Sequence, residues 1–218
     1  MAKIGVVLSG CGVMDGSEIH ESVITLLTLD RENAEIVCMA PDIEQMDVIN
    51  HLTNEKSSES RNVLVESARI ARGDIKNIKD VSAGEIDALI FPGGFGAAKN
   101  LCDFAVQGEN CTPNPEVSRL VKEMVAAKKP IGFICIAPAL AAKTLGSDIH
   151  PKLTIGTDVG TAEKISAMGA EHIACQVTDF VVDSENKIVS TPAYMLGKRI
   201  SEVAEGIEKL VKEVLALI

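Results

Sequence analysis

The sequence predicts an α/β fold of three layers, in which a mostly parallel central sheet carries helices on both faces. Short, continuous apolar runs recur along the chain, and such runs are typical of strands buried on both sides. Segments with helical spacing of apolar residues follow most of them, and this alternation is typical of a parallel sheet covered by helices. A chain of 218 residues that is 46% hydrophobic can bury a substantial core in one domain.

The amino-terminal half of the predicted fold has three strands and two helices. The expected elements are a strand at 3–9, a helix at 18–29, a strand at 36–40, a helix-like segment at 57–72 and a strand at 87–91. Apolar residues at helical spacing, Ile19, Val23, Leu26 and Leu27, indicate the first helix, and Asp15 and Glu18 fit a capping box at its start. Residues 42–78 read as an insertion that carries its own helix.

The carboxyl-terminal half continues the same pattern and then changes it. A helix is expected at 116–128, a strand at 131–134 and a helix beginning at 137. The turn-rich residues 183–186 separate two short apolar runs, 180–182 and 188–190, and this arrangement predicts a hairpin. An amphipathic helix over 201–218 would close the fold.

Composition and charge exclude several classes of function. The formal charge is −10 with a pI near 4.9, so a nucleic-acid partner is not expected, since such proteins concentrate Lys and Arg. No apolar run is long enough to cross a bilayer, and the first ten residues do not resemble a signal peptide. We therefore expect a cytoplasmic protein with no membrane partner.

Six cysteines are spread through the chain without any CxxC pair. This spacing does not indicate a zinc site, and no metal or other cofactor is expected. Because the chain is neither small nor predicted to be secreted, most of these thiols are interpreted as reduced, small apolar side chains.

Ligands of open parallel sheets bind beyond the carboxyl ends of the strands, so the loops 9–18, 92–100 and 135–139 are the informative ones. In the third loop Cys135 joins a buried strand to a helix, which is the context of a nucleophile elbow, although the usual flanking glycines are absent. The following helix N-terminus would favour the thiolate and lower the pKa of Cys135. The alternative interpretation is a buried core cysteine.

The other two loops could supply partners for this thiol. Gly93 and Gly94 lie where main-chain N–H groups can approach a ligand closely and stabilise an oxyanion, although such glycines more often mark a tight turn. Glu18 and Glu21 lie one turn apart on the helix after the first loop, and a carboxylate there could contact the thiol as an acid or a base. The usual alternative for such a carboxylate is a solvated surface charge.

The motifs on these loops resemble those of the ThiJ/PfpI superfamily of class I glutamine amidotransferase-like proteins over nearly the whole chain. They are similar above all to the ElbB branch, described as isoprenoid-biosynthesis or glyoxalase-like proteins. The motifs are Leu8-Ser-Gly-Cys-Gly-Val13, Asp15-Gly-Ser-Glu-Ile-His-Glu21, Val48-Ile-Asn-His-Leu-Thr53, Phe91-Pro-Gly-Gly-Phe-Gly-Ala-Ala-Lys-Asn-Leu101, Gly132-Phe-Ile-Cys-Ile-Ala-Pro-Ala139 and Thr191-Pro-Ala-Tyr-Met195. The resemblance implies a single flavodoxin-like domain over 1–218.

The resemblance also implies roles for particular residues. Cys135 would be the nucleophile, Glu21 the helix carboxylate that contacts it, and Gly93, Gly94 and the backbone of Ile136 the oxyanion-binding amides. The histidine of a full Cys-His-acid triad is missing, because Ile136 follows the cysteine and the segment 153–157 offers none. His150, in the loop before that segment, is the nearest substitute, although a lone loop histidine is usually just solvated.

The implied activity is the cofactor-independent conversion of glyoxal to glycolate, with a small reactive carbonyl compound as substrate and a homodimer as the expected assembly. Two alternatives stay open. One is a redox-responsive protein in which an exposed, low-pKa Cys135 is oxidised reversibly. The other is a protein or nucleotide deglycase, which shares the chemistry but accepts larger substrates. Glutaminase activity is disfavoured, since no His-x-Glu pair follows late in the chain.

Overall fold

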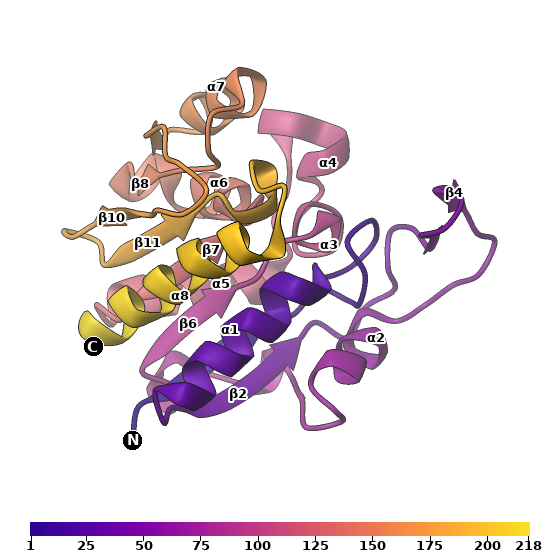
Figure 1. Ribbon diagram of the computed structural model, residues 1–218, viewed down its shortest axis with the longest axis horizontal. Helices are drawn as coiled ribbons and strands as arrows, with labels where there is room; N and C mark the ends of the chain where they lie inside the picture. The colour runs from indigo at the N-terminus through magenta and orange to yellow at the C-terminus, as the bar shows by residue number, and fades with distance from the viewer.

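The computed structural model describes all 218 residues, and its centre is a seven-stranded sheet (Figure 1). The strands lie in the order β10-β11-β7-β6-β1-β2-β5, and every neighbouring pair is parallel except β10 and β11. Their bounds are β1 Lys3–Val7, β2 Glu35–Ala40, β5 Lys76–Asn77, β6 Ala88–Phe91, β7 Ile131–Ile134, β10 Val181–Asp183 and β11 Ile188–Thr191. The predicted mostly parallel sheet and the predicted hairpin are confirmed.

Helices cover both faces of this sheet, as predicted. On one face α1 and α8 lie side by side in front of the strands, and α5 and α6 lie behind them (Figure 1). The helices are α1 Ile19–Arg31, α2 Val63–Ile70, α3 Phe95–Lys99, α4 Phe104–Gln107, α5 Pro115–Ala126, α6 Pro138–Ile149, α7 Val159–Ala167 and α8 Ile200–Ala216. Short 3₁₀ turns span Ile78–Asp80, Ala83–Glu85, Gly108–Asn110 and Ala193–Met195. No helix of this protein is both long and apolar enough to cross a membrane.

The first helix differs from the expectation in its cap and in its buried face. Glu18, and not Asp15, is the N-cap, because its side chain accepts a hydrogen bond from the Glu21 N–H. Asp15 instead accepts one from the Ile49 N–H at 2.7 Å. Ile19 and Val23 are 44% and 49% exposed, so the apolar stripe that indicated the helix faces outward.

The buried face of α1 is largely polar. The hydroxyl groups of Ser22, Thr25 and Thr28 each donate to the carbonyl four residues earlier, at 2.7–2.8 Å. Each hydroxyl is therefore satisfied inside its own helix, which removes most of the cost of burying it. This arrangement lets a helix whose inner face includes Glu21 pack against the sheet.

Residues 42–78 contain more than a helical insertion. The helix α2 is shorter than the predicted 57–72, and a small hairpin of β3 Ile49–Asn50 and β4 Glu55–Lys56 extends away from the sheet (Figure 1). The segment then returns to add β5 to the edge of the main sheet beside β2. A further small sheet pairs β8 Lys152–Leu153 with β9 Glu171–His172, so the segment 153–157 adds no strand to the main sheet.

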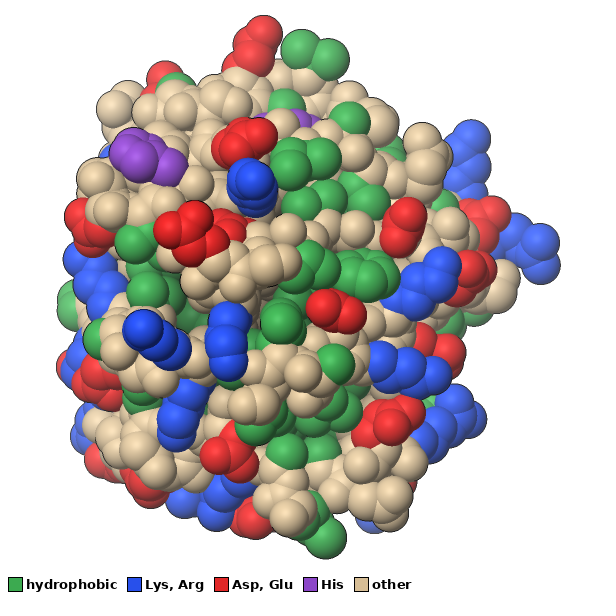
Figure 2. Space-filling model, turned by 90° about the vertical axis from the view of Figure 1, so that its left-hand side faces the viewer, with side chains coloured by type: hydrophobic (Ala, Val, Ile, Leu, Met, Phe, Trp, Pro, Cys, Tyr) green, Lys and Arg blue, Asp and Glu red, His purple; other side chains and the backbone are tan.

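Charged side chains of both signs share the surface. On the face shown in Figure 2, Lys and Arg are interspersed with Asp and Glu and do not gather in one basic patch. The net charge of −10 nevertheless gives the molecule a negative field.

Candidate active site

Cys135 lies at a sharp turn between β7 and α6. Its backbone has φ +63°, in the left-handed region that a non-glycine residue adopts at a cost of about 1–3 kcal/mol. The turn is held by the Cys135 N–H, which donates to the Thr191 carbonyl at 2.9 Å, and by the Ala137 N–H, which donates to the Ile134 carbonyl at 3.1 Å. The thiol is thus presented at the carboxyl end of the sheet, and 7% of the residue is exposed.

Glu21 reaches this thiol from α1 and is fully buried. Its Oε2 accepts a hydrogen bond from the Gly93 N–H at 2.9 Å, and its Oε1 accepts one from the Tyr194 N–H at 3.2 Å. The carboxyl group lies next to the Cys135 side chain, because a Cβ on Gly93 would meet both the Cys135 Cβ and Glu21 Oε2. Residues from four separate segments of the chain therefore fix one carboxyl group beside one sulfur atom.

The glycine loop after β6 closes the same site. A Cβ on Gly93 would overlap the Cys135 Cβ and lie 2.7 Å from Glu21 Oε2, so only glycine fits there. Gly94 has φ +94°, and a Cβ there would meet the backbone of Gly16 and Glu18. The backbones of Gly94 and Ile136 lie close enough to Cys135 to lower the pKa of its thiol. The Gly93 N–H donates to Glu21, so it is not free to bind an oxyanion as predicted.

The pKa of Cys135 lies well above its usual range, contrary to the expected lowering by the helix N-terminus. Burial is the largest cause, and the negative charge of Glu21 is the second. Hydrogen bonds from the Gly94 and Ile136 backbones act in the opposite direction but are weaker. The redox interpretation of the sequence requires an exposed thiol with a low pKa. In the structure Cys135 is buried and its pKa is raised.

Burial also raises the pKa of Glu21 to about 8, with the nearby charge of Glu18 as the second cause. Hydrogen bonds from Tyr194, Cys135 and Gly93 oppose this shift. At pH 7 the carboxyl group thus holds a proton that it can exchange with the thiol. Because the two groups interact, the pKa at which the first proton leaves describes the pair and not either residue alone.

A pocket of about 310 Å³ opens onto Cys135. Its lining is mostly apolar, and its residues are Val13, Glu18, Gly94, Phe95, Ala98, Phe104, Ala105, Cys135, Ile136, Thr161, Tyr194 and Met195. A mostly apolar cavity with a few convergent polar groups is typical of small-molecule sites. No group of three or more His, Cys, Asp or Glu side chains is arranged to hold a metal ion.

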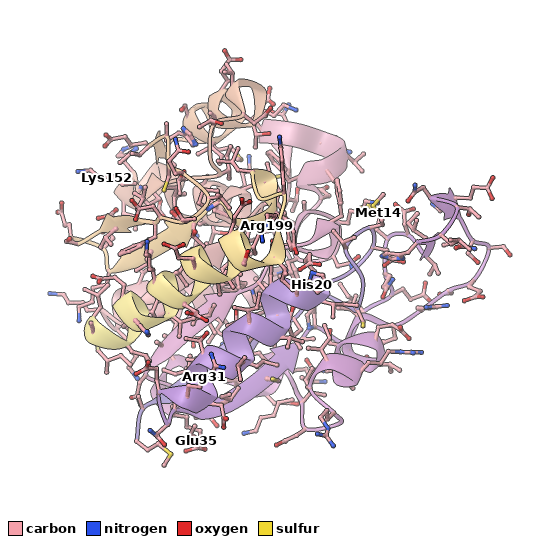
Figure 3. All side chains as sticks on the ribbon, in the orientation of Figure 1. Met14, His20, Arg31, Glu35, Lys152 and Arg199 are labelled. Carbon is pink, nitrogen blue, oxygen red and sulfur yellow. The ribbon has the colours of Figure 1, made fainter.

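No histidine contacts Cys135. His150 ends α6 and bonds to the Gly169 carbonyl at 2.8 Å. Since Cys135 precedes the other end of this 12-residue helix, the two lie about 18 Å apart along it, which rules His150 out as a direct partner. His20 is on the outer side of α1 (Figure 3), and its Nδ1 lies 2.8 Å from the Tyr194 hydroxyl. His51 and His172 bond to backbone groups elsewhere.

Sequence reasoning missed two residues of this site, Tyr194 and Glu18. Tyr194 supplies one of the amides that hold Glu21, and its side chain lines the pocket. It follows β11, the neighbour of β7 in the sheet, so the rule that ligands bind beyond strand ends could have identified it. Glu18 was predicted as part of a capping box and as one of two carboxylates, with Glu21, that could lie near the thiol, but it was not selected as a site residue.

The Gly94→Ala variant is expected to lower the free energy of unfolding by about 3 kcal/mol or more, because the new Cβ would be strained at φ +94° and would meet backbone atoms. Urea unfolding measures this loss. The matched control is Gly84→Ala, where the nearest atom would be the Ser82 Oγ at 3.7 Å and a change within about 0.5 kcal/mol is expected. Equal stability of the two variants would contradict the tight packing of the glycine loop.

Comparison with proteins of known structure places this fold in a broad class. A DJ-1 superfamily protein from Salmonella typhimurium, solved as a cysteine-to-alanine mutant, superposes with a TM-score of 0.59 at 19% identity, covering 99% of this chain and 91% of that one. An isoprenoid biosynthesis protein with an amidotransferase-like domain from Ehrlichia chaffeensis superposes with a TM-score of 0.92 at 40% identity, covering 99% and 100%. The fold is that of the DJ-1/ThiJ, class I amidotransferase-like proteins, and the resemblance found in the sequence is confirmed.

Two curated relatives narrow the assignment. The rat protein named ES1 protein homolog, mitochondrial, is 50% identical over 226 aligned positions, which cover 99% of this chain and 84% of the relative. The human glutamine amidotransferase-like class 1 domain-containing protein 3, mitochondrial, is 49% identical with coverage of 99% and 83%. No protein-family model matches the sequence. The chain belongs to the ES1 family of glutamine amidotransferase-like class 1 domain proteins.

The expected cytoplasmic location is wrong. Both of these relatives and a zebrafish relative at 34% identity are named as mitochondrial proteins, which contradicts the expectation. The expectation depended on the composition and on the first ten residues, and neither of these identifies the cellular compartment.

Proposed function

We propose that this protein is a cofactor-independent enzyme that converts glyoxal to glycolate, with Cys135 as nucleophile and Glu21 as proton carrier. The observation that supports it is the buried and adjacent pair of Cys135 and Glu21 at a pocket of about 310 Å³. The amidotransferase-like superfamily includes enzymes, which agrees with a catalytic role for this site. Glyoxal is small and uncharged, which suits a small and mostly apolar cavity.

In the first step the sulfur adds to one aldehyde carbon. The S–C bond forms, the carbonyl electron pair moves to oxygen, and this oxygen takes a proton from Glu21 to give a hemithioacetal. Because the pKa of Glu21 lies below that of Cys135, the pair that has lost one proton is mainly a carboxylate facing a thiol. Transfer of the thiol proton to the Glu21 carboxylate then gives the thiolate that attacks and the protonated carboxyl group that faces it. The Gly94 and Ile136 N–H groups would stabilise the thiolate before addition and the developing oxyanion during it.

In the second step Glu21, now a carboxylate, removes the C–H proton of the hemithioacetal carbon and forms an enediol. Return of a proton to the neighbouring carbon gives a thioester of glycolate on Cys135. Water then attacks the thioester, the C–S bond breaks, and glycolate and the free thiol are released. One carbon is oxidised while the other is reduced, so the balance needs only one water molecule and no external redox partner.

Incubation of the wild-type protein with glyoxal in D₂O tests this route. The expected product is glycolate with one deuterium on its CH₂ carbon, because the proton that Glu21 carries exchanges with solvent before it is returned. Proton NMR measures both the yield and the labelling. Methylglyoxal, glutamine and a peptide serve as alternative substrates. Absence of glycolate above the protein-free background would refute the proposed activity, and unlabelled glycolate would refute the role of Glu21 as proton carrier.

A second candidate function is peroxide sensing by Cys135. The protonated carboxyl group of Glu21 and the Gly94 and Ile136 amides would stabilise a sulfinic acid at the same sulfur. Each oxidation step transfers one oxygen atom from a peroxide to sulfur and releases water. Peroxide titration followed by mass analysis distinguishes the two functions: selective oxidation of Cys135 without glyoxal turnover would favour the sensor.

A further inference from the structure

We infer that the pocket selects carbonyl compounds without negative charge, and that Glu18 is the residue that sets this preference. The inference rests on the proposed function, since it names the substrate class of the same site. It is carried by the position of the Glu18 carboxylate, by the absence of any cation in the pocket lining, and by the apolar character of the rest of the wall.

Glu18 is held rigidly at the start of α1. Its backbone N–H donates to the Gly93 carbonyl at 2.8 Å, and its Oε2 accepts the Glu21 N–H at 2.7 Å. The residue is only 8% exposed, yet it lines the pocket, and its Oε1 has no hydrogen-bond partner in the protein. Glu18 Oε1 is not among the buried polar atoms that lack a partner, so it is accessible to water or to a ligand in the pocket.

No positive side chain balances this charge within the pocket lining. The lysines nearest its aromatic walls are Lys99, 5.5 Å from the centre of the Phe95 ring, and Lys164, 5.9 Å from the centre of the Phe104 ring. The Lys99 ammonium is already bonded to Asp47 at 3.1 Å and to the Met14 carbonyl at 3.1 Å. Lys164 is exposed, and solvent screens its charge.

A negatively charged substrate would therefore meet two penalties. It would lose hydration in a mostly apolar cavity without gaining a cation, and it would approach the Glu18 carboxylate. Glyoxal and glyoxylate illustrate the consequence, because they differ by the replacement of one aldehyde with a carboxylate and are close in size. The pocket is expected to accept the first and reject the second, and the Glu18 Oε1 can accept a hydrogen bond from a hydroxyl group of the bound hemithioacetal.

The test uses two alkylating reagents of similar size, neutral iodoacetamide and anionic iodoacetate. With each reagent an S–C bond forms at Cys135 while iodide leaves. The ratio of the two rates cancels the thiolate fraction, which is the same for both reagents, and peptide mass analysis separates Cys135 from the other five thiols. The same ratio measured on the urea-unfolded chain gives the intrinsic preference of the reagents.

The wild-type protein is expected to favour iodoacetamide by roughly tenfold to hundredfold over the intrinsic ratio. The Glu18→Gln variant, which keeps an acceptor for the Glu21 N–H, is expected to lose most of this preference. The control Glu163→Gln removes one exposed acidic charge outside the pocket and should change the ratio less than twofold. A wild-type ratio equal to that of the unfolded chain would overturn the inference. A Glu18→Gln protein that has a native thermal transition and keeps the wild-type ratio would also overturn it.

Failure of this inference is distinguishable from failure of the proposed function. Alkylation does not require turnover, so a preference that depends on Glu18 together with no glycolate production would refute the glyoxal reaction and leave the charge selection standing. Glyoxal turnover together with an alkylation ratio equal to that of the unfolded chain would refute the charge selection and leave the glyoxal reaction standing.

Discussion

Replacement of Cys135 with alanine is expected to lower kcat/KM for glyoxal by roughly 10⁴-fold or more, to the level of the protein-free background. The proposed route begins with the formation of a bond to this sulfur and ends when that bond breaks. The alanine methyl group cannot add to an aldehyde, while the Glu21 carboxyl group keeps its hydrogen bonds from the Gly93 and Tyr194 N–H groups. Glycolate production measured by NMR over several hours gives the residual rate.

The matched control for this experiment is Cys38→Ala. Cys38 is a buried thiol on β2, 8% exposed, and does not line the pocket. Its replacement should leave turnover within about twofold, although it removes a buried sulfur as well. Turnover by the Cys135→Ala protein above about a tenth of the wild-type value would show that the nucleophile has been wrongly assigned.

Replacement of Glu21 with glutamine is expected to lower kcat by roughly 10²–10⁴-fold, since an amide can accept a hydrogen bond but cannot carry a proton. In the wild type, kcat/KM should rise with pH and level off above about pH 8, where the thiol–carboxyl pair loses its first proton. The variant should not show this inflection near pH 8. A Glu21→Gln protein with wild-type kcat and an unchanged pH profile would refute the role of Glu21 as proton carrier. It would not contradict the assignment of Cys135 as nucleophile.

The raised pKa of Glu21 also predicts how the free energy of unfolding changes with pH. The pKa of Glu21 rises from an ordinary value of 4.5 to about 8 on folding, so between these values the native state binds the extra proton. The free energy of unfolding should therefore fall with rising pH in this window, by up to about 1.4 kcal/mol per pH unit from this group. Urea unfolding at several values between pH 5.5 and 7.5 should show the wild type losing stability relative to Glu21→Gln. A difference that does not change with pH would contradict the raised pKa.

Much of the fold and the central residues of the site could be predicted because they depend on local sequence patterns. Apolar runs fix which strands are buried, and parallel strands bring the residues after them to one edge of the sheet. This reasoning placed Cys135, Gly94 and Glu21 near one another, and the structure brings them together. Helix boundaries were found within a few residues where caps and periodicity agree.

The remainder depended on packing that no local pattern records. The apolar stripe of α1 pointed outward because the inner face is satisfied by hydroxyl groups and a buried carboxyl, and periodicity cannot distinguish this case from an ordinary amphipathic helix. The direction of the Cys135 pKa shift was wrong because burial and the Glu21 charge outweigh the helix N-terminus. His150 was close in sequence to the site but lies at the far end of a helix.

The left-handed turn at Cys135 and the carboxyl group beside it exist together only when β1, β6, β7 and β11 have all been assembled with α1. In an unfolded chain the same thiol is solvated and ionises as readily as any other cysteine. Slow labelling of Cys135 by an anionic reagent would then occur mainly through transient opening of the native state. The rate of that labelling, divided by the rate for the unfolded chain, would measure the fraction of molecules in which the carboxyl-terminal edge of the sheet is locally open.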